Sequence, residues 1–134
     1  VELLRIDVRR GSDVADAFQA MRKRNADAIA LFEDAVLYVS AKAIADLALE
    51  QRLPAVGFTD FANSGGLIGY GVNVPDLFRR AGYFVGKLLN GESPANIPVE
   101  RPATFDLVVN QITARSLGVR LPQSILVRAD RVID

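Results

Sequence analysis

The first half of the chain alternates short apolar runs with longer amphipathic stretches. Runs rich in Leu, Ile, Val and Ala predict three strands, at residues 2–8, 28–32 and 54–58. After Ser12 and Asp13, apolar residues recur with the spacing of one helix face, and a second helix is predicted over residues 39–51. Strands that alternate with helices over short links favour an α/β fold, a doubly wound parallel sheet in a three-layer αβα arrangement.

The second half of the chain repeats these signals around one long helix. A short strand at residues 67–70 is followed by a helix that begins near Pro75, carries a broad apolar stripe and ends before Gly91. Two prolines exclude helix and central strand from the loop at residues 92–98. The remaining pattern predicts a strand over 104–109, a helix from Asn110 through Leu117, and a tail of short helix or strand at 124–133.

Polar and aromatic residues follow two of the predicted strands at the point where each strand ends. They are Phe32, Glu33 and Asp34 after the second strand, and Thr59, Asp60 and Phe61 after the third. Ligands of doubly wound sheets bind outside the carboxyl ends of the strands, so these residues are candidates for ligand contacts. Structural roles fit them as well, because an acidic residue here can cap a helix or form an Asx turn and a phenylalanine can pack in the core.

Glycines surround the predicted strand at residues 67–70, at positions Gly65, Gly66, Gly69 and Gly71. Glycine allows backbone angles and close approaches that other residues resist, so we expect this segment to act as a hinge. Within it, Tyr70 fits a cleft wall or hinge packing, and Asn73 fits a ligand contact or a helix cap. The glycine order does not match the dinucleotide-binding fingerprint, because no Gly-x-Gly-x-x-Gly run opens a helix after a strand.

Composition narrows the classes of function. The 134 residues suffice for one core, and the 16 basic and 16 acidic residues cancel, so charge predicts neither a nucleic-acid partner nor a membrane surface. The chain has no Cys and no His, which removes thiol nucleophiles, histidine bases and the usual zinc ligands. It also lacks a P-loop and a nucleophile elbow. We therefore expect no catalytic residues, no cofactor and no metal.

Several motifs in order along the chain resemble one known family. They are Leu-Pro-Ala-Val-Gly-Phe at 53–58, Gly65-Gly66-Leu67 with Tyr70-Gly71, Pro-Asp-Leu-Phe-Arg-Arg at 75–80, Lys-Leu-Leu-Asn-Gly at 87–91, Phe-Asp-Leu-Val-Val-Asn at 105–110 and Arg-Ala-Asp at 128–130. With these motifs the chain resembles the substrate-binding proteins of a group of ABC transporters that includes tryptophan-binding lipoproteins. The resemblance covers nearly the whole chain and is specific from Leu53 onward.

The resemblance implies the fold of type I periplasmic binding proteins, in which two α/β lobes are joined by three crossings. Residues 1–134 would then form the C-terminal lobe, with 72–100 as a segment that belongs to the first lobe, and a secretion signal and the rest of that lobe would precede them. The implied function is capture of a small organic solute, an amino acid or a related compound, by hinge closure. Carboxylates at Asp34 and Asp60 would suit a ligand ammonium.

The resemblance also implies partners and a location. An ABC permease and its ATPase would receive the solute, and the protein would be periplasmic or otherwise extracytoplasmic, with a lipid anchor as one form of attachment. Without a first lobe, the apolar face of the helix after Pro75 is expected to dock back on its own lobe or on a second copy, as a homodimer or domain swap. The alternative function is the effector-binding domain of a LacI-type transcriptional regulator, which uses the same lobes.

Overall fold

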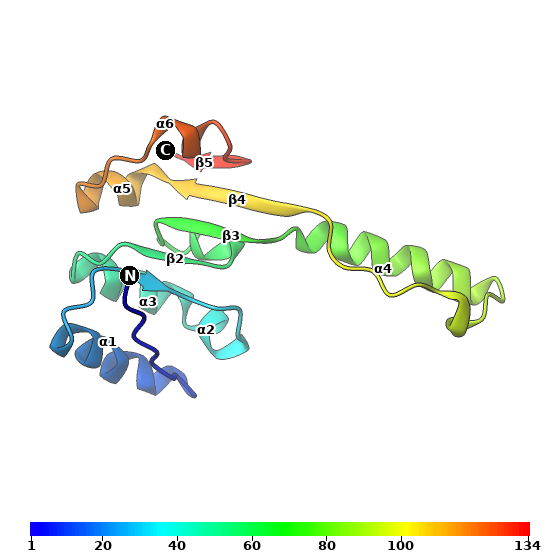
Figure 1. Cartoon of the computed structure of the whole chain (residues 1–134), viewed down its shortest axis with the longest axis horizontal. Coiled ribbons are helices and arrows are strands. Elements are labelled where there is room, and N and C mark those ends of the chain that lie inside the picture. Colours follow the sequence, from blue (N-terminus) through cyan, green and yellow to red (C-terminus); the bar gives the residue numbers. More distant parts are fainter.

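The computed structural model describes residues 1–134 and consists of a lobe built on a five-stranded sheet and an arm that projects from it (Figure 1). The strands are β1 (Ile29–Ala30), β2 (Ala55–Gly57), β3 (Ile68–Val72), β4 (Phe105–Asn110) and β5 (Arg131–Ile133). They lie in the sheet in this order. The pairs β1–β2, β2–β3 and β4–β5 are parallel, whereas β3 and β4 are antiparallel, with Val72 opposite Phe105.

Helices surround the sheet and supply half of its core. They are α1 (Val14–Lys23), α2 (Ala35–Val39), α3 (Ala41–Glu50), α5 (Gln111–Leu117) and α6 (Gln123–Leu126). Phe18 of α1 and Ile44 of α3 are buried against the strands together with Phe58 and Phe61, which follow β2. The α/β class and the parallel pairing of the strands predicted at 28–32 and 54–58 are confirmed, as are the predicted helices after Asp13 and from Asn110 to Leu117.

Two sequence predictions about local structure are wrong. Residues 2–8 form no strand and are largely exposed, because the neighbouring edge strand β1 has only two ladder residues and offers little backbone for pairing. The strand predicted at 28–32 shortens to these two residues, since β1 lies at the edge of the sheet and pairs with β2 alone. The helix predicted at 39–51 corresponds to α3 and is confirmed, whereas the short helix α2, which ends at Val39 just before it, was not predicted.

The arm consists of α4 (Val74–Leu89), a short 3₁₀ helix at Pro94–Asn96 and an extended return to β4. Asn73 caps the amino end of α4, since its side chain accepts a hydrogen bond from the Asp76 amide at 2.8 Å. Gly91 follows its carboxyl end with a φ of 89°, a left-handed conformation that suits glycine. The start, the cap and the end of this helix agree with the sequence prediction.

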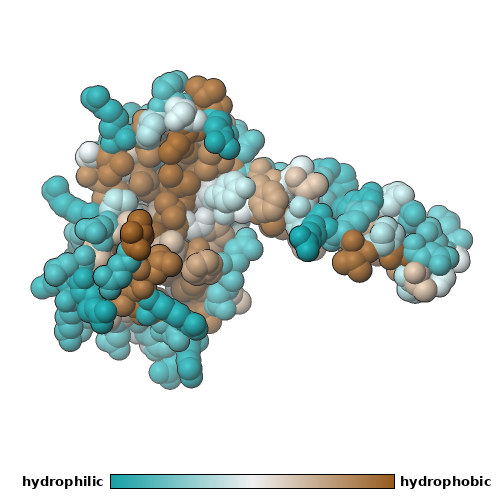
Figure 2. Space-filling view, viewed as in Figure 1, coloured by the Kyte–Doolittle hydropathy of each residue, from teal (hydrophilic) through white to brown (hydrophobic).

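The arm does not dock on its own lobe, so that part of the expectation is wrong. The backbone amide of Asn73 donates to the Thr104 carbonyl at 3.0 Å, which continues the pairing of β3 with β4 beyond the last ladder residues. This pairing directs α4 away from the sheet, and no residue of the segment 74–104 is buried (Figure 1). Figure 2 shows hydrophobic residues at the surface of the arm, among hydrophilic ones. Nothing in the structure supports a homodimer or domain swap.

Polar contacts within the arm hold α4 and the return segment together. Arg80 pairs with Glu100, with a distance of 2.6 Å from Nε to Oε2, and its guanidinium lies 4.4 Å from the centre of the Tyr83 ring. Lys87 and Glu92 form a second ion pair at 3.2 Å. Neither α4 nor any other helix is both long and apolar enough to cross a bilayer. The arm is therefore an amphipathic helix that two ion pairs connect to the segment after it, and its apolar face is exposed.

Candidate functional site

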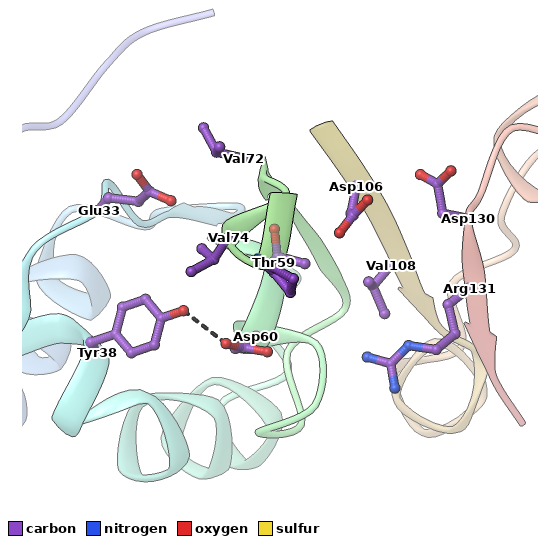
Figure 3. A pocket seen from close by; sticks show the side chains of 11 residues that line it. Glu33, Tyr38, Thr59, Asp60, Val72, Val74, Asp106, Val108, Asp130 and Arg131 are labelled. Carbon is purple, nitrogen blue, oxygen red and sulfur yellow. Dashed lines mark hydrogen bonds between the residues drawn. The ribbon is translucent and has the colours of Figure 1, made fainter. Parts of the chain in front are cut away.

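The antiparallel pairing of β3 with β4 brings two kinds of strand end to one edge of the sheet. The carboxyl ends of β1, β2 and β3 lie there beside the amino ends of β4 and β5. A cavity of about 360 Å³ opens at this edge (Figure 3). Its charged lining residues are Glu33, Asp60, Asp106, Asp130 and Arg131. The other lining residues are Tyr38 and Thr59 with Val72, Val74, Pro75 and Val108.

Tyr38 and Asp60 form one wall of this cavity. The Tyr38 hydroxyl donates a hydrogen bond to Asp60 Oδ2 at 2.8 Å, and Asn63 Nδ2 donates to Asp60 Oδ1 at 3.1 Å. Behind Tyr38, the buried Phe58 ring stacks on it with centroids 4.0 Å apart and an interplanar angle of 13°. The Asp60 carboxylate is thus oriented by two donors, and each oxygen keeps a further lone pair for a ligand.

The pKa of Tyr38 reflects this setting. Burial raises it to about 12, and the hydrogen bond to Asp60 and the negative charges of Asp60 and Glu33 act in the same direction. Each of these causes disfavours the phenolate, because it would lie in a less polar place beside carboxylates. Tyr38 therefore remains a neutral hydrogen-bond donor across the physiological pH range.

Thr59 and two glycines pack closely at the floor of the cavity. A Cβ atom on Gly69 would lie 2.2 Å from the Thr59 carbonyl oxygen, and one on Gly71 would lie 2.9 Å from Thr59 Oγ1 and 3.2 Å from Glu33 Oε1. Only glycine permits this approach of β3 to the turn after β2. Thr59 Oγ1 is buried and has no hydrogen-bond partner.

The opposite wall comes from the amino ends of β4 and β5 (Figure 3). Asn73 Nδ2 donates to both carboxylate oxygens of Asp106, at 3.0 and 2.9 Å, so the residue that caps α4 also holds this acid. Asp130 Oδ2 accepts from the Leu107 amide at 2.7 Å. Arg131 donates to the side-chain oxygen of Asn63, which links the two walls.

The charge of the cavity is predominantly negative. Four carboxylates line it, and Arg131 supplies the one positive side chain in the lining. Opposite charges attract more strongly in a partly enclosed site than in open water. The site therefore favours a ligand with a positively charged group. No group of three or more His, Cys, Asp or Glu side chains has an arrangement that would hold a metal ion.

The structure brings some of the candidate residues together and separates others. Glu33, Thr59 and Asp60 line the cavity. Asp34 caps α2, because its side chain accepts from the Val36 amide at 2.8 Å. Asn73 does not line the cavity but contacts Asp106, which does.

The aromatic candidates lie elsewhere. Phe61 is fully buried in the core, and a Cβ on Gly66 would lie 2.2 Å from its ring. Phe32 is 83% exposed outside the cavity lining. Tyr70 is half-exposed and stacks on Phe105 across the β3–β4 pair, with centroids 5.8 Å apart. Of the remaining hinge glycines, Gly65 has a φ of 108°.

Sequence reasoning missed Tyr38, Asp106, Asp130 and Arg131. The rule for parallel sheets directs attention to carboxyl ends only, whereas these last three residues stand at the amino ends of β4 and β5. A prediction that the strand after Phe105 pairs antiparallel with the strand that ends at Val72 would have placed these three residues at the same edge of the sheet. Tyr38 had a weaker signal, since an aromatic residue in the helix after β1 reads equally well as core.

Comparisons with known proteins identify the family of the chain and structures with a similar fold. A family model described as ABC transporter substrate binding protein matches residues 1–133. No curated protein matches the chain. Among solved structures, a conserved domain protein from Vibrio cholerae is 23% identical with a TM-score of 0.89, over 98% of this chain and 45% of that one.

Two further structures are similar. An ABC domain in complex with L-Trp from Streptococcus pneumonia is 26% identical with a TM-score of 0.86, over 96% of this chain and 43% of that one. A substrate-binding protein with adhesive properties from Clostridium difficile, in a ligand-free, open form, is 21% identical with a TM-score of 0.69, over 97% and 43% of the two chains.

This chain therefore spans less than half the length of each of these structures. The likeness covers its whole fold, a lobe of the type I periplasmic binding protein kind with a mostly parallel sheet. With the family model matched from the first residue to the last but one, the chain belongs to the family of ABC transporter substrate-binding proteins.

Proposed function

We propose that this chain is the C-terminal lobe of a solute-binding protein that captures a small organic solute in a cleft between two lobes. The observation that carries the proposal is the acidic cavity of about 360 Å³ at the strand ends, where ligands of doubly wound folds bind. The solute is delivered to an ABC permease driven by its ATPase. The mechanism is binding and hinge closure rather than catalysis.

The charge and shape of the cavity suit an amino acid or a related compound. Glu33 and Asp60 on one wall and Asp106 on the other offer acceptors for an ammonium group, and Arg131 offers a donor for a carboxylate. The similar structure from Streptococcus pneumonia is described as a complex with L-Trp, which supports an amino-acid ligand for this chain. Thr59 lies between the wall formed by Tyr38 and Asp60 and the wall formed by β4 and β5 (Figure 3).

In this proposal the arm belongs to the first lobe. Residues 72–100 would pack on the sheet of that lobe, which would cover the apolar face that α4 now exposes. The glycines around β3 would act as a hinge where the chain crosses between the lobes. The relation in length supports this division, because the chain covers 43–45% of the similar structures. The protein would work outside the cytoplasm, free in the periplasm or held by a lipid anchor.

A thermal-shift screen tests solute capture. The protein that carries this chain together with its first lobe is screened against amino acids and small aromatic or carboxylic solutes, as wild type and as Asp60→Ala. A ligand that binds only the folded state raises the melting temperature by mass action. We expect at least one solute to do so in the wild type and to lose the effect in Asp60→Ala.

The matched control is Asp46→Ala, which removes an exposed aspartate of α3 that pairs with Lys42 outside the cavity. It should keep the full ligand-induced shift. The proposal fails if no solute shifts the wild type, and a DNA retardation in its place would support the regulatory alternative. Equal losses in the two variants would remove Asp60 from the site.

A further inference from the structure

The turn that follows α4 contains a pair of residues with a chemistry of its own. Asn90 comes directly after the last residue of the helix and is followed by Gly91, and no other asparagine of the chain precedes a glycine. Both residues are exposed. Hydrogen bonds hold the side chains of Asn63, Asn73 and Asn110, whereas the side chain of Asn90 forms none.

An asparagine followed by glycine can lose its side-chain amide without an enzyme. The backbone nitrogen of the glycine attacks the side-chain carbonyl carbon, a C–N bond forms, and the side-chain nitrogen leaves as ammonia. Water then opens the resulting succinimide ring at one of its two carbonyl groups, which gives aspartate or isoaspartate. Glycine favours the ring closure because it has no Cβ that would obstruct the approach. The space around Gly91 is free as well, since no atom lies within 4 Å of the place a Cβ would take.

The native turn holds the reacting atoms apart. Asn90 has a ψ of 9°, which puts the Gly91 nitrogen beside the Asn90 nitrogen rather than beside the Asn90 side chain. The Gly91 amide donates to the Leu88 carbonyl at 3.0 Å. The ion pair of Lys87 and Glu92, at 3.2 Å, spans the same turn. The attack therefore requires the turn to open, and a helix end with exposed residues and few contacts opens at low cost.

We propose that Asn90 is a deamidation site and that the ion pair of Lys87 and Glu92 controls its rate by holding the turn closed. This modification is separate from solute capture and does not depend on it. The new carboxylate lies at the carboxyl end of α4, where the helix dipole disfavours negative charge, and it competes with Glu92 for Lys87. Isoaspartate also adds a carbon to the main chain, which shifts the return segment relative to α4. Deamidation therefore loosens the arm.

Amide loss is measured on the folded chain. It is incubated at neutral and at mildly alkaline pH in water labelled with heavy oxygen, digested with pepsin at acid pH, and analysed by tandem mass spectrometry. We expect Asn90 to gain the label before any other asparagine, and faster at the higher pH because the attacking nitrogen must lose its proton. Asn90→Gln should abolish this signal. The matched control is Asn96→Gln, an exposed asparagine of the arm that precedes isoleucine and should leave the rate at Asn90 unchanged.

A second measurement tests the control by the ion pair. Glu92→Gln removes the charge and leaves the backbone as it is, so the turn should open more often. We expect faster hydrogen exchange of the Gly91 amide and a rate of amide loss at Asn90 about two- to fivefold higher, the range that corresponds to an exposed ion pair. The chain unfolded in urea gives the upper limit of the rate, since its turn is always open.

The outcomes separate the site from its control. If the Gly91 amide exchanges at the wild-type rate in Glu92→Gln, or exchanges faster without faster amide loss, control by the ion pair is refuted and the site stands. If the folded wild type keeps Asn90 intact over a period in which the unfolded chain converts completely, the site itself is refuted. Earlier labelling of another asparagine would refute it as well.

Discussion

The lobe and the arm of this protein differ in how much of their apolar surface is buried. In the lobe, Phe58, Phe61 and Val109 are almost completely buried, and every buried residue of the chain lies before residue 74 or after residue 104. In the arm, Phe78 is 72% exposed and Leu89 83% exposed. The lobe therefore has a hydrophobic core of its own, whereas the arm has an apolar face that the rest of the chain does not cover.

The helices α3 and α4 make the comparison sharper. Both are amphipathic, yet α3 buries Ile44 and three alanines, and α4 buries nothing. The difference lies in what the chain places beside them, because α3 packs on the sheet, whereas α4 has beside it only a single extended return segment. An amphipathic pattern predicts the helix and its inner face, but the covering surface has to come from elsewhere.

The largest expected contrast is in the cost of removing a phenylalanine. Phe61→Ala in the core of the lobe should lower the free energy of unfolding by about 3–5 kcal/mol, because it leaves a cavity under β2 and β3. Phe78→Ala in the arm should change it by less than about 0.5 kcal/mol, since the ring is mostly in water. Urea denaturation followed by circular dichroism measures both. Similar costs would show that the arm is packed in solution.

Glycine substitutions give the next contrast, and they should differ in sign. Gly69→Ala places a Cβ 2.2 Å from a backbone oxygen of Thr59, so we expect a loss of about 1–3 kcal/mol in the free energy of unfolding. Gly82→Ala in α4 meets no atom within 4 Å and should stabilise the helix by about 0.5–1 kcal/mol. Thermal unfolding and helix content report the two effects. A tolerated Gly69→Ala would contradict the close approach of β3 to Thr59.

The junction of the two regions should show a smaller effect. Asn73→Ala removes the cap of α4, which is typically worth about 1 kcal/mol, and releases the Asp106 carboxylate. Hydrogen exchange should accelerate at the amides of Asp76 and Leu77 while the lobe remains protected. Asn73→Ser, which restores a capping oxygen but not the donor to Asp106, serves as the control. Unchanged exchange in Asn73→Ala would show that the cap does not hold the helix.

The smallest effect is expected at the ion pair of the arm. The hydrogen bond from Arg80 lowers the pKa of Glu100 from its usual value, although partial burial acts against this. A carboxyl group whose pKa is lower in the folded chain stabilises the fold above its unfolded pKa and loses that contribution as the pH falls through the folded value. Acidification should therefore reduce amide protection in α4 around Arg80 in the wild type. Glu100→Gln should lose this pH dependence, and an unaltered profile in that variant would exclude the pair as its cause.

The sequence predicted the helices of this protein better than the pairing of its strands. The periodic stripes after Asp13 and Pro75 and the caps at Asn73 and Asn110 are local signals, and the structure contains these helices with nearly the predicted ends. The strand predicted at residues 2–8 failed because strand formation depends on a partner edge, which a local pattern does not specify.

The residues of the candidate site likewise fall into those that local sequence indicates and those that long-range pairing brings in. Glu33, Thr59 and Asp60 were found because a parallel strand and its exit are contiguous in sequence. Asp106 and Asp130 approach them only through the antiparallel pairing of β3 with β4, a contact across more than thirty residues of arm. Tyr38 became recognisable only when its ring was seen against Phe58 and Asp60.

The central claim is that the lobe carries a solute site at its strand ends and that the arm does not. A titration of the isotopically labelled chain with L-tryptophan, followed by amide chemical shifts, tests it most directly. The account predicts saturable shifts at Glu33, Thr59 and Asp60 and none along residues 77–100. Shifts confined to the arm, or no saturable shift at the strand ends with tryptophan or any other amino acid, would contradict it.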